Sequence, residues 1–135
     1  MRTLLAGTTA LALLVSASAA TAGPHDAAIE AIIAEAAADW SAVLSCSILD
    51  RDDHATTLRW WEEELAELAP LLEEADVAQK LAARFLAALA PEVLMAPTEG
   101  NAADLIAFCN EAGDWRRRLA MLTIVQPTIA VERLL

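Results

Sequence analysis

The densest group of side chains able to bind a metal ion is the run DRDDH at residues 50–54. Hard cations such as Ca²⁺ favour several carboxylate oxygens from a single loop. A calcium loop starting at Asp50 would need glycine at its sixth position and glutamate at its twelfth, where the chain has Ala55 and Trp61. The run therefore predicts a solvated turn, with Asp53 capping the helix that follows, and no bound metal or other cofactor.

Carboxylates and guanidinium groups also gather at residues 62–76 and 116–118, respectively. Paired carboxylates can act as acid and base. Here consecutive glutamates lie on a predicted exposed helix, where Glu63 and Glu67 repel each other at a spacing of four residues. Three consecutive arginines point about 100° apart around a helix, which favours separate ion pairs over one anion site. Both clusters therefore predict solvated or ion-paired surfaces.

The sequence contains no recognisable catalytic motif. No serine or cysteine has an identifiable base partner, no glycine-rich loop is present to hold phosphate, and there is no HExxH motif. We therefore predict no catalytic residues and no enzymatic activity. An enzyme of unrecognised type is kept as the last of three interpretations.

The four tryptophans divide into core candidates and one exception. Trp40 and Trp61 lie in the middle of apolar helical stripes and are predicted to be core, whereas Trp115 lies at a stripe edge. Trp60 is placed about 100° from Trp61, among glutamates. It is either covered by the C-terminal tail or exposed as the contact residue for a partner.

The first 22 residues have the three parts of a secretory signal peptide. A basic start is followed by a short apolar segment at residues 4–15 and by the small residues ATA at 20–22. An apolar segment of about 12 residues is shorter than the ~20 needed to cross a bilayer, which disfavours an uncleaved anchor. We predict cleavage after Ala22 and a periplasmic or secreted mature protein.

The only two cysteines are Cys46 and Cys109. In an exported chain they most simply form one disulfide. It closes a loop of about 60 residues, for which the chain-entropy estimate is ~4 kcal/mol. Two separate buried thiols are the alternative. A redox-active pair is disfavoured because the chain has no Cys-x-x-Cys spacing.

Apolar residues recur at helical spacing in four segments. The first helix is expected from Pro24 to about Ser45, and the second from near Ala55, with Pro70 kinking or ending it. A third helix is expected to begin at a capping pair, Asp76 and Gln79. The fourth carries the stripe of residues 105–122, which includes Cys109 and is capped by Asn101. Gly113 is a candidate break in this helix, and the tail either starts a turn at Pro127 or lies extended.

These segments predict an all-α fold, a small bundle of four or five helices with one long-range disulfide between the first and the fourth. The expected organisation is a signal peptide at residues 1–22 and a single helical domain at residues 23–135. No run of alternating β-branched residues is long enough for a sheet, and tyrosine is absent.

Charge limits the partners. The chain has a formal net charge of −11, and loss of Arg2 with the signal peptide leaves 20 acidic against 8 basic side chains. Nucleic acid and anionic lipid are both bound by concentrated Lys and Arg, so neither is expected as a partner. No segment after residue 22 is expected to span or anchor in a membrane, and the sequence does not set the oligomeric state.

The predicted architecture is similar to that of small two-cysteine helical proteins of the bacterial periplasm, including acid-stress chaperones. The resemblance covers the export signal, the disulfide and the helical content, without a shared motif. The first interpretation is an exported, non-enzymatic protein-interaction module that contacts a partner protein through the Trp60 region. The second is a periplasmic acid-stress chaperone, in which acid neutralises the carboxylates and loosens the bundle.

Overall fold

The computed structural model describes residues 22–95, 100–121 and 123–135. These residues form seven α-helices, one 3₁₀ turn and no strand, which confirms the all-α fold class. The predicted signal peptide lies outside the described residues except for Ala22. The elements are α2 (Asp26–Cys46), η1 (Ser47–Leu49), α3 (Arg51–Glu74), α4 (Gln79–Ala88), α5 (Pro91–Leu94), α6 (Ala102–Ala112), α7 (Trp115–Ala120) and α8 (Pro127–Glu132).

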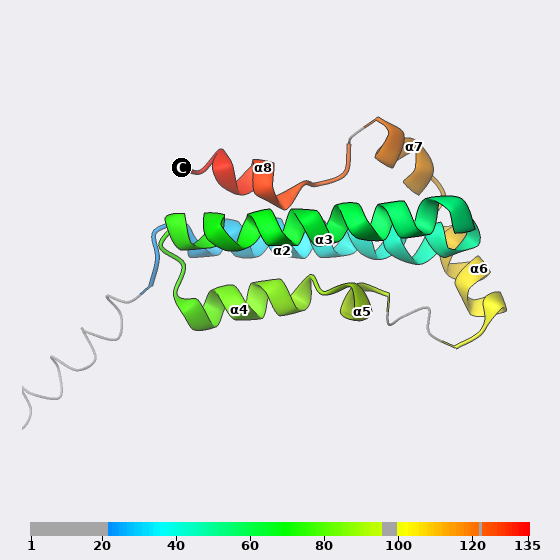
Figure 1. The fold of residues 1–135 in the computed structure, drawn as a ribbon, viewed down its shortest axis with the longest axis horizontal. Helices are drawn as coiled ribbons and strands as arrows, with labels where there is room; N and C mark the ends of the chain where they lie inside the picture. The colour runs from blue at the N-terminus through cyan, green and yellow to red at the C-terminus, as the bar shows by residue number, and fades with distance from the viewer. Residues whose placement is uncertain (1–21, 96–99, 122) are drawn as a thin grey trace, which may run out of the picture.

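The helices are arranged around a central antiparallel pair, α2 and α3 (Figure 1). On one side of this pair lie α4 and α5, and on the other lie α7, the segment that follows it, and α8. α6 crosses the end of the bundle where α2 finishes and α3 begins. Every other helix therefore covers one face or one end of the same two-helix unit.

α2 is the apolar centre of this arrangement. It contacts helices on both sides of the central pair, and its buried side chains recur at helical spacing: Ile29, Ile33, Ala36, Trp40, Val43 and Leu44. The segment Asp26–Leu49 is long and apolar enough to cross a membrane, with a mean hydropathy of 1.5 over a window that is 44% buried. The prediction that no segment after residue 22 is long and apolar enough to cross a membrane was therefore wrong in terms of length and composition. The reason is that α2 is covered on several sides and is apolar on several faces.

The junction between α2 and α3 is shorter than predicted. The sequence predicts a solvated turn at residues 50–54, but α3 already begins at Arg51, separated from η1 only by Asp50, which stands at the N-cap position predicted for Asp53. Ser47 explains the tight junction. It is buried, and its hydroxyl donates to the Leu44 carbonyl at 2.9 Å and lies 2.8 Å from His54 Nδ1. These hydrogen bonds hold the end of α2 close to the first turn of α3, so only η1 and Asp50 connect the two helices.

Of the two predictions for Pro70, the one that ends the helix there is wrong, and the predicted cap of the next helix is wrong as well. Pro70 lies within the helix, which continues to Glu74. Asp76 does not cap α4; it has a positive φ of 59° and follows the C-terminus of α3. The Asp76 N–H donates to Glu73 O at 3.0 Å and the Val77 N–H donates to Leu72 O at 3.0 Å, which is the Schellman pattern of helix termination.

The predicted fourth helix is two helices in the structure. Asn101 caps α6 as predicted, its side-chain oxygen accepting from the Asp104 N–H at 2.8 Å. Gly113 then adopts φ 46° and ψ −59°, a backbone conformation open mainly to glycine, and α7 begins two residues later. The tail was predicted either to start a helical turn at Pro127 or to lie extended. The structure has the first of these, because α8 begins at Pro127. The break at Gly113, with the short helices α5 and α8, brings the number of helices above the predicted four or five.

Candidate functional site

A pocket of about 700 Å³ lies between the N-terminal half of α3 and the layer formed by α7 and the following segment. Pockets of this volume are typical of ligand-binding sites. Its walls combine three indole rings with carboxylates and a guanidinium group. The residues used below are Trp40, Trp60, Trp115, Asp50, Asp53, Glu64 and Arg116.

Trp60 and Trp61 lie on different faces of α3. Trp61 is 0% exposed, stacks on Trp40 and donates its indole N–H to the Leu89 carbonyl at 2.8 Å. Trp60 is 51% exposed and lines the pocket. Trp60 is thus exposed and not covered by the C-terminal tail, while its contact with a partner stays a prediction. Trp40 and Trp61 are both core, as predicted, and Trp40 also reaches the pocket wall.

Two carboxylates fix the layer of α7 and the tail to the central pair. Asp39 of α2 accepts from Arg118 Nη2 at 2.7 Å and from the Val125 N–H at 3.1 Å. Glu64 Oε1 accepts from both the N–H and the hydroxyl of Thr128, at 2.9 and 2.7 Å. The sequence predicts ion pairs for the arginines but identifies neither Asp39 nor Glu64 as an anchor, because each pairs with groups more than 60 positions away.

The tail is also held by the aromatic core. The Trp40 indole N–H donates to the Val125 carbonyl at 2.8 Å, so Val125 is bonded through both of its backbone polar groups. Ile124, the preceding residue, is buried in the main core and lines the pocket. The tail therefore forms one wall of the pocket and leaves Trp60 half exposed.

The pocket already contains one cation bound by the chain itself. The Arg116 guanidinium carbon lies 5.2 Å from the centre of the Trp115 ring, within the range of a cation–π contact. Its Nη2 atom is 4.0 Å from Asp50 Oδ2, in a pair whose side chains are 66% and 38% exposed. Such an exposed pair contributes at most about 1 kcal/mol, so the Arg116 side chain is held weakly.

The carboxylates outnumber this cation. Asp50, Asp53 and Glu64 all line the pocket, against the single guanidinium of Arg116. Within the described part of the chain, the Asp53 carboxylate makes no hydrogen bond or ion pair, whereas Glu64 and Asp50 have the partners given above. The pocket consequently offers aromatic faces together with uncompensated negative charge.

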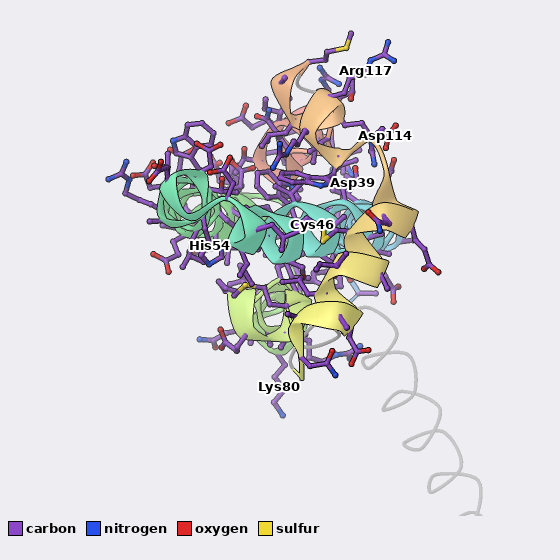
Figure 2. All side chains as sticks on the ribbon, turned by 90° about the vertical axis from the view of Figure 1, so that its right-hand side faces the viewer. Asp39, Cys46, His54, Lys80, Asp114 and Arg117 are labelled. Atoms are coloured by element: carbon purple, nitrogen blue, oxygen red, sulfur yellow. A yellow bond between two sulfur atoms is a disulfide. The ribbon has the colours of Figure 1, made fainter. Side chains whose placement is uncertain are left out.

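The other two arginines of the cluster point elsewhere. Arg118 pairs with Asp39, and Arg117 extends away from the body of the protein (Figure 2). Two of the three arginines thus form separate ion pairs, as the sequence predicted, Arg118 with Asp39 of α2 and Arg116 with Asp50 at the N-cap of α3. The remaining acidic residues of the 50–54 run do not converge. Among the described residues, no three His, Cys, Asp or Glu side chains lie close enough together to hold a metal ion.

The predicted disulfide is present and positions the α7 wall. Cys46 and Cys109 are bonded with their Cα atoms 5.5 Å apart, joining the end of α2 to α6 (Figure 2). Both cysteines are buried, in a small cluster with Leu105 that Trp115 packs against. Trp115 also packs on the main core. The disulfide therefore fixes α6, and α7 with its pocket residues follows directly after the Gly113 turn.

The groups assembled in the pocket are suited to binding. Indole faces attract cations and apolar groups, and the carboxylates add a preference for positive charge. Compared with known proteins, the chain matches no family model, no curated protein and no solved structure.

Proposed function

We propose that this chain is an exported, non-enzymatic protein that binds a partner protein through the pocket at Trp60. The observation that carries the proposal is the position of Trp60, which is 51% exposed at a pocket containing two further tryptophans. Tryptophan is enriched among the residues that contribute most to protein–protein binding. The predicted signal peptide and the disulfide support export to the periplasm or the exterior.

The proposed partner presents a lysine or arginine side chain to the pocket. The lining carries three carboxylates and one guanidinium group, in a chain whose formal net charge is −11. Arg116, stacked on Trp115 beside Asp50, is an internal example of a cation taken up by these groups. A cation over an indole ring contributes about 0.5–1 kcal/mol at an exposed site and ~2 when desolvated.

Exposed apolar side chains beside the pocket favour a partner larger than a free amine. Leu49, directly before Asp50, is 48% exposed, and Met121, directly after the lining residue Ala120, is 61% exposed. A small cation bound in the pocket would leave these side chains uncovered. A protein segment with a basic residue flanked by apolar residues can cover both, and burying apolar surface contributes about 25 cal/mol per Å².

The proposal is tested by placing a photo-crosslinking amino acid, benzoylphenylalanine, at position 60 of the full chain in cells of its native host. Matched variants carry it at positions 93 and 106, because Val93 and Ile106 are similarly exposed, at 52% and 48%, outside the pocket lining. We expect one adduct of defined mass at position 60 that is absent from both controls, with the crosslinked partner peptide containing lysine or arginine.

Two results would contradict the proposal. Absence of an adduct at position 60, or the same adducts at all three positions, would show that the pocket is not a specific contact. An adduct whose partner peptide has no basic residue would leave partner binding in place and reject the proposed cationic chemistry.

A further inference from the structure

Asp26, the first residue of α2, has a carboxylate oxygen without a hydrogen-bond partner in the described part of the chain. Asp26 Oδ2 accepts a hydrogen bond from the Gly23 backbone nitrogen at 2.9 Å. Its other oxygen, Oδ1, is buried and has no hydrogen-bond partner among the described residues. Buried polar atoms nearly always have a hydrogen-bond partner in native proteins, so a donor to Asp26 Oδ1 is expected.

Gly23 is packed tightly against the same carboxylate. A Cβ atom added at position 23 would lie 2.6 Å from Asp26 Oδ1 and 2.6 Å from the backbone oxygen of Asp76. This oxygen belongs to the turn between α3 and α4, which lies beside the start of α2 (Figure 1). Within the described part of the chain, it accepts no hydrogen bond. Two acceptors without donors therefore lie next to the Gly23 Cα atom.

The predicted cut supplies the missing donors. Hydrolysis of the Ala22–Gly23 peptide bond consumes one water, leaves a carboxylate on Ala22, and converts the Gly23 amide nitrogen into a primary amine. An α-amino group has a reference pKa of about 7.7–8.0 and is mostly protonated at neutral pH. The amide had one N–H donor, whereas an ammonium group has three.

We propose that Gly23 is the first residue of the mature protein and that its ammonium group is held by both oxygens of Asp26 and by the Asp76 carbonyl. The inference rests on the proposed export, which provides the cut, and goes beyond it by giving the cut a structural role. Glycine is required at this position because any side chain would displace one of the two acceptors. Removal of the signal peptide then satisfies a buried carboxylate, so the mature chain is more stable than its precursor.

The chain offers an internal control for measuring this ammonium group. Its only lysine is Lys80, so a processed molecule has two acylable amines, the α-amine and the Lys80 side chain. Lys80 is exposed and points outward (Figure 2). At neutral pH an unrestrained α-amine reacts faster than a lysine, because a larger fraction of it is unprotonated.

The experiment starts from the full chain, exported and processed by a bacterial host, with the N-terminus read by mass spectrometry. The purified protein is treated with acetic anhydride at pH 7, folded and in guanidinium chloride, and labelling of the two amines is followed separately. We expect an N-terminus at Gly23, and an α-amine that reacts at least about tenfold more slowly when folded, corresponding to a shift of one pKa unit. Asp26→Asn should remove this protection without changing Lys80, while the neighbouring Glu30→Gln should retain it.

The outcomes separate the two proposals. An N-terminus other than Gly23 overturns this inference together with the predicted cleavage. A Gly23 N-terminus whose amine reacts as fast folded as unfolded overturns the ammonium contact and leaves export in place. The comparison of folded and unfolded wild-type protein decides the question even if Asp26→Asn fails to fold.

Discussion

Trp40 and Trp61 stack across the central helix pair with their ring centres 4.4 Å apart and their planes inclined by 25°. Each indole N–H reaches a carbonyl in a different outer layer, Trp40 that of Val125 and Trp61 that of Leu89. The stacked pair thus joins the α4 side of the bundle to the tail side. Trp60 is next to Trp61 in the chain. Its position at the pocket is therefore set by a neighbour that is held by ring stacking and by the hydrogen bond of its indole N–H.

Truncating the two neighbouring tryptophans should therefore have opposite consequences. Trp61→Ala should lower the free energy of unfolding by about 3–5 kcal/mol, as expected for a fully buried aromatic residue. Trp60→Ala should lower it by no more than about 1 kcal/mol, because half of this side chain is already in water. Denaturant unfolding of both variants measures the difference. Equal destabilisation would mean that Trp60 is a core residue and would remove it as a contact.

The disulfide should contribute a large part of the stability. Cys46→Ser should reduce the free energy of unfolding by ~2–5 kcal/mol, since the bond closes a loop of 63 residues. Thiol titration of unfolded, unreduced wild-type protein should find no free cysteine. Two reactive thiols, or an unchanged melting temperature in the variant, would contradict this prediction.

Gly113 and Gly100 provide a matched test of the break between α6 and α7. Gly113→Ala should destabilise the protein by about 1 kcal/mol or more, because its φ of 46° is unfavourable for alanine. At Gly100 a Cβ atom would have only an ordinary contact, 3.6 Å from Asp104 Oδ2. Gly100→Ala should be neutral or slightly stabilising. Similar effects of both substitutions in thermal unfolding would argue that α6 and α7 are not held apart by Gly113.

The pocket should prefer a basic peptide. A short peptide with lysine between apolar residues is expected to quench or shift tryptophan fluorescence more than the same peptide with glutamine. Asp53→Asn should weaken this binding about two- to fivefold, as for loss of one partly solvated charge contact of ~0.5–1 kcal/mol. Glu74→Gln, an exposed control on α3 outside the pocket lining, should have no effect at matched ionic strength. Equal binding of the two peptides would reject the cationic preference.

Local patterns were sufficient for much of the fold. The apolar period of α2 and the cap at Asn101 depend on residues within a few positions of one another, so they are visible in sequence. Gly113 and Pro127 likewise mark boundaries through their own backbone preferences. The disulfide could be predicted because the chain offers only one cysteine pair.

The predictions that failed depended on tertiary surroundings. Residues 50–54 were predicted as a turn ahead of the helix; Asp52 and Asp53 are exposed, but the buried hydroxyl of Ser47 closes the junction and α3 already starts at Arg51. The Asp76–Gln79 spacing fits a capping pair, yet Asp76 is used to end α3. The pocket was not predictable, because its walls come from four separated segments. Only Trp60 signalled it, as an apolar side chain placed among glutamates.

The bonds of Asp39 and Trp40 span most of the chain, and this sets the order in which the fold can be completed. Arg118 lies 79 positions from Asp39, and Val125 lies 85 positions from Trp40. Contacts this distant close late, because the entropy of loop closure is lost before they form. During synthesis the Asp39 carboxylate and the Trp40 indole N–H therefore gain these partners only after residues 118–125 have emerged.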